Sequence, residues 1–417
     1  MKSLTFGMNK IKITYKLYFL FTIFSFWGCT EEFIPSTENF EDLLVVETTI
    51  TDEFKFQKIK LTNTYTFKDS LALPVTNAKI LIKDNFDQEY LFQYKEEDTA
   101  YLSLEKFKAE PNNSYQLYIE TASGENYESL PETLPPVSNL EVQLSKENID
   151  DKFGASFKVN STNPINEVIY YRYEYQEAYK VIAPYWGPNE AIYVRESPFT
   201  TNYCYISYQP RQEDDKVCYT VKDSKEIILA TTSNQSESNL SDFLIKFVPQ
   251  SSWRSAHRYA LNVKQHVINY DTYNYYRTLK KISGSGENEN TLSPNQPGFL
   301  QGNIKSTTSD KKILGYFEIA SYSSERIFFN YDDLYPNEPK PEYYIDCNVE
   351  EIVSGYPCGT PPLPENLERL MSLISFGNKS LFKIKQGDPW DTYFMVETPC
   401  SKCTSISSNE IPDFWYE

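Results

Sequence analysis

Short stretches that alternate between apolar and polar residues limit the folds open to this chain. The clearest lie at residues 44–50, 58–62, 78–83 and 115–119. β-branched, aromatic and aliphatic residues favour strands at this spacing, and turn-forming residues such as Asn112 and Asn113 separate the stretches. Several short strands divided by turns predict a β-sandwich over residues 41–136. The proline-rich segment 131–136 ends it, because clustered prolines cannot continue a strand ladder.

The remaining residues, 137–417, are predicted to form a larger domain that is again mostly β. Strands are expected at residues 167–175, 225–230, 258–265, 314–320 and 326–329. One helix is expected within residues 270–281, where Tyr273, Tyr276 and Leu279 fall on one side. The six cysteines that follow position 200 place any disulfides in this domain.

A second helix is predicted around residues 367–374, where apolar residues recur at helical spacing. Pro364 precedes this segment and Gly377 follows it, as is typical of the two ends of a helix. The expected fold class is therefore mainly β, with one or two short helices in the larger domain.

The N-terminus carries a predicted lipoprotein signal peptide, residues 1–28. Lysines precede an apolar run over residues 17–27, which is about half the roughly 20 residues that a membrane-spanning helix needs. Gly28 and Cys29 follow directly. A basic, then apolar, then small segment before a cysteine predicts cleavage and acylation at Cys29, with palmitate or related chains as the anchor. A plain cleaved signal with an incidental cysteine is the alternative.

An acidic pair follows the predicted lipidation site. Glu31 and Glu32 resemble the export signal that sends lipoproteins of Bacteroidetes-type bacteria to the outer face of the outer membrane. We expect residues 29–40 to form a flexible acidic tether, and the protein to be lipid-anchored in the outer membrane and exposed at the cell surface. A solvated tether without a sorting role is the alternative for Glu31 and Glu32.

The charge balance argues against nucleic acid as a partner. The chain has 58 acidic and 40 basic residues and a formal net charge of −18. Phosphate backbones repel so acidic a surface, whereas net charge of this size favours solubility outside a cell. Nucleic-acid binding is therefore not expected.

Cysteine usage predicts disulfide bonds. Apart from Cys29, the chain contains Cys204, Cys218, Cys347, Cys358, Cys400 and Cys403. An even number in an exported chain is typical of disulfides, and six cysteines allow fifteen pairings. A bridge between Cys204 and Cys218 across a hairpin is expected, and the other four would then pair among themselves. Residues 400–403 also fit a redox motif or half a zinc site, but neighbouring sequence supports neither.

Ordered segments along the chain resemble one known family. They are residues 44–47, 74–80, 113–117 and 127–129, NQPGFLQGNI at 295–304, LGYF at 314–317, PCSKC at 399–403 and PDFW at 412–415. The family is that of Bacteroidetes outer-membrane lipoproteins catalogued as domain of unknown function 4249. This resemblance implies an immunoglobulin-like N-terminal β-sandwich followed by a larger β domain. Members of that family are often encoded beside TonB-dependent transporters and have no assigned reaction, so the resemblance brings no catalytic or ligand-binding residue.

The sequence offers no clear reaction centre. His257 and His266 are its only histidines, and no nucleophile elbow, paired-histidine motif, phosphate loop or dinucleotide fingerprint occurs. One histidine would suffice for a serine or cysteine nucleophile, so an enzyme is disfavoured without being excluded. We therefore predict a non-enzymatic protein with no catalytic residue, no cofactor and no metal site.

Tyrosine, with 34 residues, is the main compositional excess. Aromatic faces make adaptable binding surfaces, although tyrosine is also favoured on half-exposed strands. Tyr185 and Trp186 lie in a loop between Pro184 and Pro188, and they are the predicted ligand contacts. A loop tucked against the protein is the alternative.

The leading functional hypothesis is an accessory binding or capping partner of a TonB-dependent transporter in nutrient uptake. The tether would confine the β domains near the transporter and raise their effective concentration there. An adhesion or envelope-structural lipoprotein is the second hypothesis. A hydrolase is the third, and it would require a pocket joining His257 or His266 to a nucleophile.

Overall fold

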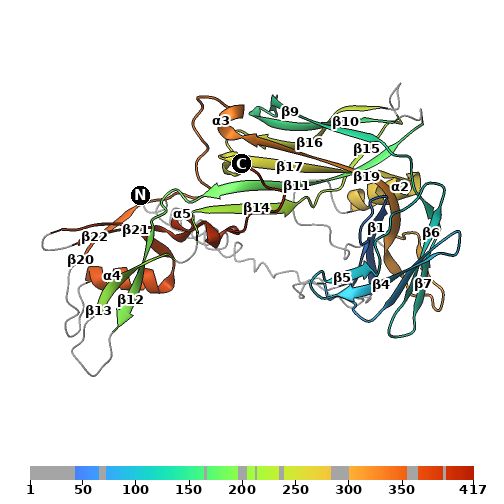
Figure 1. The fold of residues 1–417 in the computed structure, drawn as a ribbon, viewed down its shortest axis with the longest axis horizontal. Coiled ribbons are helices and arrows are strands. Elements are labelled where there is room, and N and C mark those ends of the chain that lie inside the picture. The colour runs from blue at the N-terminus through green and yellow to red at the C-terminus, as the bar shows by residue number, and fades with distance from the viewer. Residues whose placement is uncertain are drawn as a thin grey trace, which may run out of the picture.

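The computed structural model describes residues 43–64, 72–163, 167–195, 204–211, 214–233, 239–282, 300–354, 365–387 and 391–417. These residues are mainly β, as predicted (Figure 1). Cys29, Glu31, Glu32 and Cys358 lie outside the described residues, as do the signal peptide and the tether. Lipidation, surface export and any bond of Cys358 therefore stay predictions.

The N-terminal unit is built from short strands whose alternate residues face one core. They are β1 (Leu44–Thr51), β2 (Lys58–Asn63), β3 (Lys79–Asp84), β4 (Glu89–Lys95), β5 (Ala100–Ser103), β6 (Ser114–Glu120), β7 (Asn126–Ser129) and β8 (Glu132–Thr133). In β6, Tyr115, Leu117 and Ile119 are buried and alternate with partly exposed neighbours. Hydrogen bonds join the unit in the order β1-β2-β5-β4-β3-β6-β7. The finer immunoglobulin-like description stays a prediction.

The larger unit has two sheets that face each other across an aromatic core. One has the order β14-β11-β17-β19 and the other β16-β10-β9. Their strands are β9 (Asn139–Ile149), β10 (Lys152–Thr162), β11 (Tyr170–Ile182), β14 (Val217–Asp223), β15 (Ile228–Thr231), which also pairs with β11, β16 (Leu240–Pro249), β17 (Arg258–Ile268) and β19 (Ile313–Asn330). Phe157 of β10 meets Tyr259 of β17 with ring centroids 6.0 Å apart. Both side chains are fully buried.

Buried tyrosines account for part of the tyrosine excess. Tyr173 and Tyr259 are fully buried, and each hydroxyl has a polar partner. Tyr173 donates to Gln265 at 3.1 Å, and Tyr259 donates to Glu177 at 2.9 Å. Their rings fill the core while their hydroxyl groups stay hydrogen-bonded, so these tyrosines are structural.

Strand β19 belongs to both units. Its first half, Ile313 to Ala320, pairs in parallel with β1, and its second half pairs antiparallel with β17. The nearby strand β18 (Ile304–Ser306) pairs with β7. The N-terminal unit therefore includes strands from beyond residue 300. A boundary at residue 136 would assign these strands to the larger unit.

A small third sheet lies at the opposite end of the molecule from the N-terminal strands (Figure 1). The sheet has the order β20-β22-β21, with β20 (Glu350–Ser354), β21 (Lys379–Lys385) and β22 (Asp391–Glu397). Its neighbours are helix α4 (Glu365–Phe376) and the two-stranded pair β12 (Asn189–Arg195) and β13 (Cys204–Pro210). Helix α4 confirms the helix expected around residues 367–374, and it buries Leu370 against the sheet. Helix α2 (Tyr270–Ile282) confirms the other. Shorter helices are α3 (Tyr331–Leu334) and α5 (Thr398–Ser401), with single 3-10 turns at Trp253–Ser255 and Cys403–Ser405.

Two disulfides tie the C-terminal segment to the larger unit. Cys218 is bonded to Cys403, and Cys347 to Cys400. The pairing of Cys218 with Cys204 across a hairpin is therefore wrong. The hairpin does not form because β14, which carries Cys218, pairs with β11, whereas β13 pairs with β12. A bond that joins positions 185 residues apart could not be deduced from local spacing.

We expect the Cys218→Ser/Cys403→Ser double variant to lose about 2–5 kcal/mol of unfolding free energy, because the bond constrains a long loop of the unfolded chain. Urea unfolding under oxidising conditions measures the loss. The Cys218→Ser single variant is the control and should behave like the double variant. Unchanged midpoints would contradict this role for the bond.

Candidate functional site

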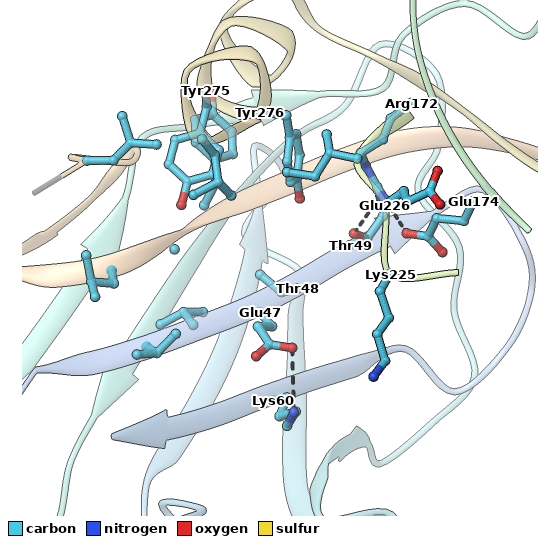
Figure 2. Close-up of a pocket in the computed structure, with 18 of the residues that line it drawn as sticks. Glu47, Thr48, Thr49, Lys60, Arg172, Glu174, Lys225, Glu226, Tyr275 and Tyr276 are labelled. Carbon is cyan, nitrogen blue, oxygen red and sulfur yellow. Dashed lines mark hydrogen bonds and ion pairs between the residues drawn. The ribbon is translucent and has the colours of Figure 1, made fainter. Parts of the chain in front are cut away.

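A cavity of about 660 Å³ lies where the N-terminal unit meets the larger unit. Its floor is the outer face of β1 and β2, and α2 lies across it as a roof (Figure 2). Strands β11 and β19 and the segment between β14 and β15 contribute the sides. Its volume falls in the range of roughly 300–1,000 Å³ that is usual for small-molecule sites.

The strand register makes the floor apolar at one end and charged at the other. Alternation along β1 brings Val45, Glu47 and Thr49 to the same face. The parallel register sets Leu314 of β19 beside Val45. Four residues further along β19, it sets Glu318 beside Thr49. The floor therefore runs from aliphatic side chains to Thr49, and the buried Glu318 lies beside Thr49 without lining the cavity.

A buried ion cluster forms the charged end. The Nη2 atom of Arg172 lies 2.8 Å from Glu318 Oε1, and the Glu318 side chain is 0% exposed. Glu174 contacts the other guanidinium nitrogen of Arg172. The ring of Tyr276 lies 5.0 Å from the same guanidinium. Burial raises the pKa of the Tyr276 hydroxyl well above its ordinary value, and the Glu318 carboxylate adds to the rise. Arg172 is thus committed to groups of the protein itself.

The apolar end is lined by aliphatic side chains that remain half-buried. Leu279 and Ile282 extend from α2, and Ile227, Leu300 and Leu314 come from the surrounding segments. None of the five belongs to a hydrophobic core of the described residues. They present apolar surface to the cavity instead of filling a core.

Lysines stand at the cavity's margin. Lys60 pairs with Glu47 at 3.6 Å, and Lys58 pairs with Asp98 at 3.3 Å. All four side chains are more than a third exposed, so these pairs are weak. Lys225 makes no ion pair within the part of the chain that the structure describes. In Figure 2 the amines of Lys60 and Lys225 extend to the side opposite α2.

The family model described as "Domain of unknown function (DUF4249)" matches residues 30–326. The chain belongs to the DUF4249 family. The match includes the whole N-terminal unit and every residue that lines the cavity. The match ends inside β19. Residues 399–403 and 412–415, which also resemble the family, therefore lie beyond it. The search of curated proteins found no match for the chain.

Neither histidine of this DUF4249 protein lines the cavity. His266, on β17, is buried, and its Nε2 lies 3.9 Å from Glu174 Oε2. Burial lowers the pKa of His266 well below its ordinary value, and the positive charge of Arg172 lowers it further. Burial likewise lowers the pKa of His257 to about 4. Both rings are therefore neutral at physiological pH. His266 adjoins the lining residue Glu174 without lining the cavity itself.

Tyr185 and Trp186 are half-buried and held by the protein itself. Trp186 Nε1 donates to Asp215 at 2.7 Å, and the Tyr185 ring meets Phe382 at 5.0 Å between centroids. The amine of Lys216 lies 5.4 Å from the Trp186 ring. These residues lie apart from the cavity lining, and a ligand contact there stays a prediction.

The described residues contain no group of three or more histidines, cysteines or carboxylates that could hold a metal ion. Among the same residues, no helix is both long and apolar enough to cross a membrane.

Sequence reasoning found part of the cavity but not the cavity itself. It placed Tyr273, Tyr276 and Leu279 on one side of a helix. Tyr276 and Leu279 line the cavity, and Tyr273 does not. It missed the ion pair of Arg172 and Glu318, whose partners are 146 positions apart. One signal was present: Glu318 interrupts the apolar strand that continues with Ile319. A carboxylate in such a strand needs a buried partner.

We expect Glu318→Gln to lower the free energy of unfolding by about 3 kcal/mol, because it leaves the buried Arg172 without its fully buried partner. Glu174→Gln is the matched control. Glu174 is 40% exposed, so its loss should cost about 1 kcal/mol or less. Urea unfolding measures both variants. Equal losses, or a larger loss for Glu174→Gln, would contradict the assigned roles.

The lowered histidine pKa values predict that stability falls as the pH drops. The unfolded chain takes up protons near pH 6.5, whereas folded His257 does so only near pH 4. The free energy of unfolding should therefore decrease between about pH 6.5 and 4 and stay level above pH 7. His257→Gln should show a shallower decrease in urea midpoints measured at pH 7.5, 5.5 and 4.5. Parallel pH profiles for the variant and the parent protein would argue against this assignment.

Proposed function

We propose that this protein is a lipoprotein, anchored by acylated Cys29 on the outer face of the outer membrane, that binds a nutrient molecule and presents it to a TonB-dependent transporter. It acts by binding, without chemical change to the ligand. The observation that carries the proposal is the cavity between the two β units, which has the size of a ligand site and is only partly filled by side chains.

The N-terminal sequence supports the anchor. Lysines, a short apolar run and Gly28 precede Cys29, and an acidic pair follows it. Each buried methylene of an acyl chain adds roughly 0.8 kcal/mol of membrane affinity, so several chains would hold the protein permanently. The segment from Cys29 to Leu44 spans at most about 50 Å when fully extended. The cavity would then stay close to the membrane and to any transporter in it.

The chemistry of the cavity supports binding over catalysis. Arg172, the buried cation of its lining, is neutralised by Glu318, which lies outside the lining. Its lining residues, as far as the structure describes them, include no histidine, cysteine or aspartate. An aliphatic end and a lysine margin suit recognition of a small molecule. Members of the family are often encoded beside TonB-dependent transporters, which supports partnership with one.

We expect Cys29→Ala to abolish incorporation of radiolabelled palmitate and to release the protein from membranes, because no acyl chain can then attach. Cells grown with the label, then fractionated and immunoprecipitated, provide the measurement. Cys358→Ala is the control and should keep both the label and the membrane location. A Cys29→Ala protein that stays labelled would refute the proposed anchor.

The transporter partnership is tested by purifying the wild-type lipoprotein from its own cells in mild detergent. Mass spectrometry should identify a TonB-dependent transporter in near-stoichiometric amount. Surface protease treatment of intact cells should also cleave the lipoprotein, because the cavity must face the medium. Repeated recovery of the lipoprotein alone would contradict the partnership, and protection from the protease would contradict surface exposure.

A further inference from the structure

The cavity's aliphatic end indicates the body of the ligand. Leu279, Ile282, Leu300, Leu314 and Ile227 line it, are half-buried and join no core cluster of the described residues. Apolar surface that faces a water-filled cavity gains free energy when an apolar group covers it. The ligand body that fits this end is aliphatic.

The aromatic residues do not offer a platform for stacking. The face of Tyr276 is taken by Arg172, whose guanidinium lies 5.0 Å from the ring. Tyr275 packs against Tyr316 and Tyr276, with ring centroids 5.0 and 5.5 Å apart. Sugars and nucleobases bind by stacking on open aromatic faces, so the cavity does not favour them.

The lysine margin indicates the charge of the ligand's polar end. Arg172 is held by Glu318 and Glu174 and is not available to a ligand. Lys60 has only a long, exposed pair, and Lys225 has no ion pair within the described chain. Lys58 also lines the cavity, but its pair with Asp98 is shorter, at 3.3 Å, so Lys60 and Lys225 are the cations that a ligand recruits most readily. They stand out because the chain as a whole carries an excess of acidic residues.

The lining holds fewer carboxylates than cations. Glu174 contacts Arg172, and Glu47 shares only the weak, exposed pair with Lys60. Glu226 makes no ion pair within the described chain. With Arg172 and Glu174 paired, the three lining lysines face two carboxylates, so the remaining charge of the lining favours an anion.

We propose that the cavity binds an amphipathic anion: an aliphatic body against Leu279, Ile282 and Leu314, with a carboxylate or phosphate head at Lys60 and Lys225. This inference rests on the proposed function in that it treats the cavity as the ligand site, and it names the class of ligand.

Isothermal titration calorimetry tests the proposal on the full chain carrying Cys29→Ala. Because this variant has no acyl chains, it needs no detergent, which would compete with the probe for the cavity. The probe is dodecanoate below its micelle concentration, and dodecyl phosphate is the second head group. Dodecyltrimethylammonium has the same chain and the opposite charge. We expect saturable one-to-one binding of both anions, at least tenfold tighter than binding of the cation. No binding of either anion, or binding of the cation as tight as theirs, would overturn the proposal.

Two pairs of variants locate the site. Lys60→Glu/Lys225→Glu should weaken dodecanoate binding at least tenfold and leave the urea midpoint nearly unchanged, since both lysines are exposed or weakly paired. Lys152→Glu/Lys385→Glu changes the net charge equally at exposed positions outside the cavity and should leave affinity within about twofold. Equal losses for both pairs would show a general charge effect and overturn the assigned site.

The outcomes separate this inference from the proposed function. Calorimetry uses neither membrane nor transporter, so tight anion binding without transporter recovery would refute the partnership alone. Transporter recovery without anion binding would refute the ligand class alone.

Discussion

The parallel pairing of β1 with β19 is the constraint on which the rest of the structure depends. It joins the two units along Leu44 to Thr51, while the second half of β19 continues into the larger sheet. The backbones come very close at Gly315, whose φ is +114°. A methyl group there would lie 2.0 Å from the carbonyl oxygen of Val46. Only glycine allows this approach, and the cavity's shape follows from it because β1 forms part of the floor and β19 one of the sides.

A buried carboxylate in the proline-rich segment 131–136 fixes the same junction. Glu132 accepts hydrogen bonds from Asn303 and Tyr316, each at 2.9 Å, and from Asn269 at 3.1 Å. Burial raises the pKa of Glu132, and these hydrogen bonds offset only part of that rise. The proline-rich linker is therefore a packed part of the junction. Its polar groups require specific partners from β19 and from the residues just before β18 and α2, which restricts how the two units can sit.

Much of the secondary structure could be predicted from the sequence, whereas the long-range partners could not. Alternation and helical spacing depend on neighbouring residues, so β6, α2 and α4 were found. Predicted strands at residues 314–320 and 326–329 proved to be one strand that switches partners, and no local pattern reveals such a switch. The bond of Cys218 to Cys403 and the pair of Arg172 with Glu318 depend equally on topology. For that reason the cavity, which unites distant segments, stayed hidden.

The cavity stays open because α2 is held at points other than its aliphatic residues. Asn269, just before the helix, donates to Glu132, and Thr272 in its first turn is fully buried. Tyr276, one turn further along, packs over Arg172. These contacts leave the last turn, with Leu279 and Ile282, above the floor and outside the hydrophobic clusters of the described residues. A helix positioned only by hydrophobic burial would instead sink onto β1, so the polar contacts at its beginning preserve the space at its end.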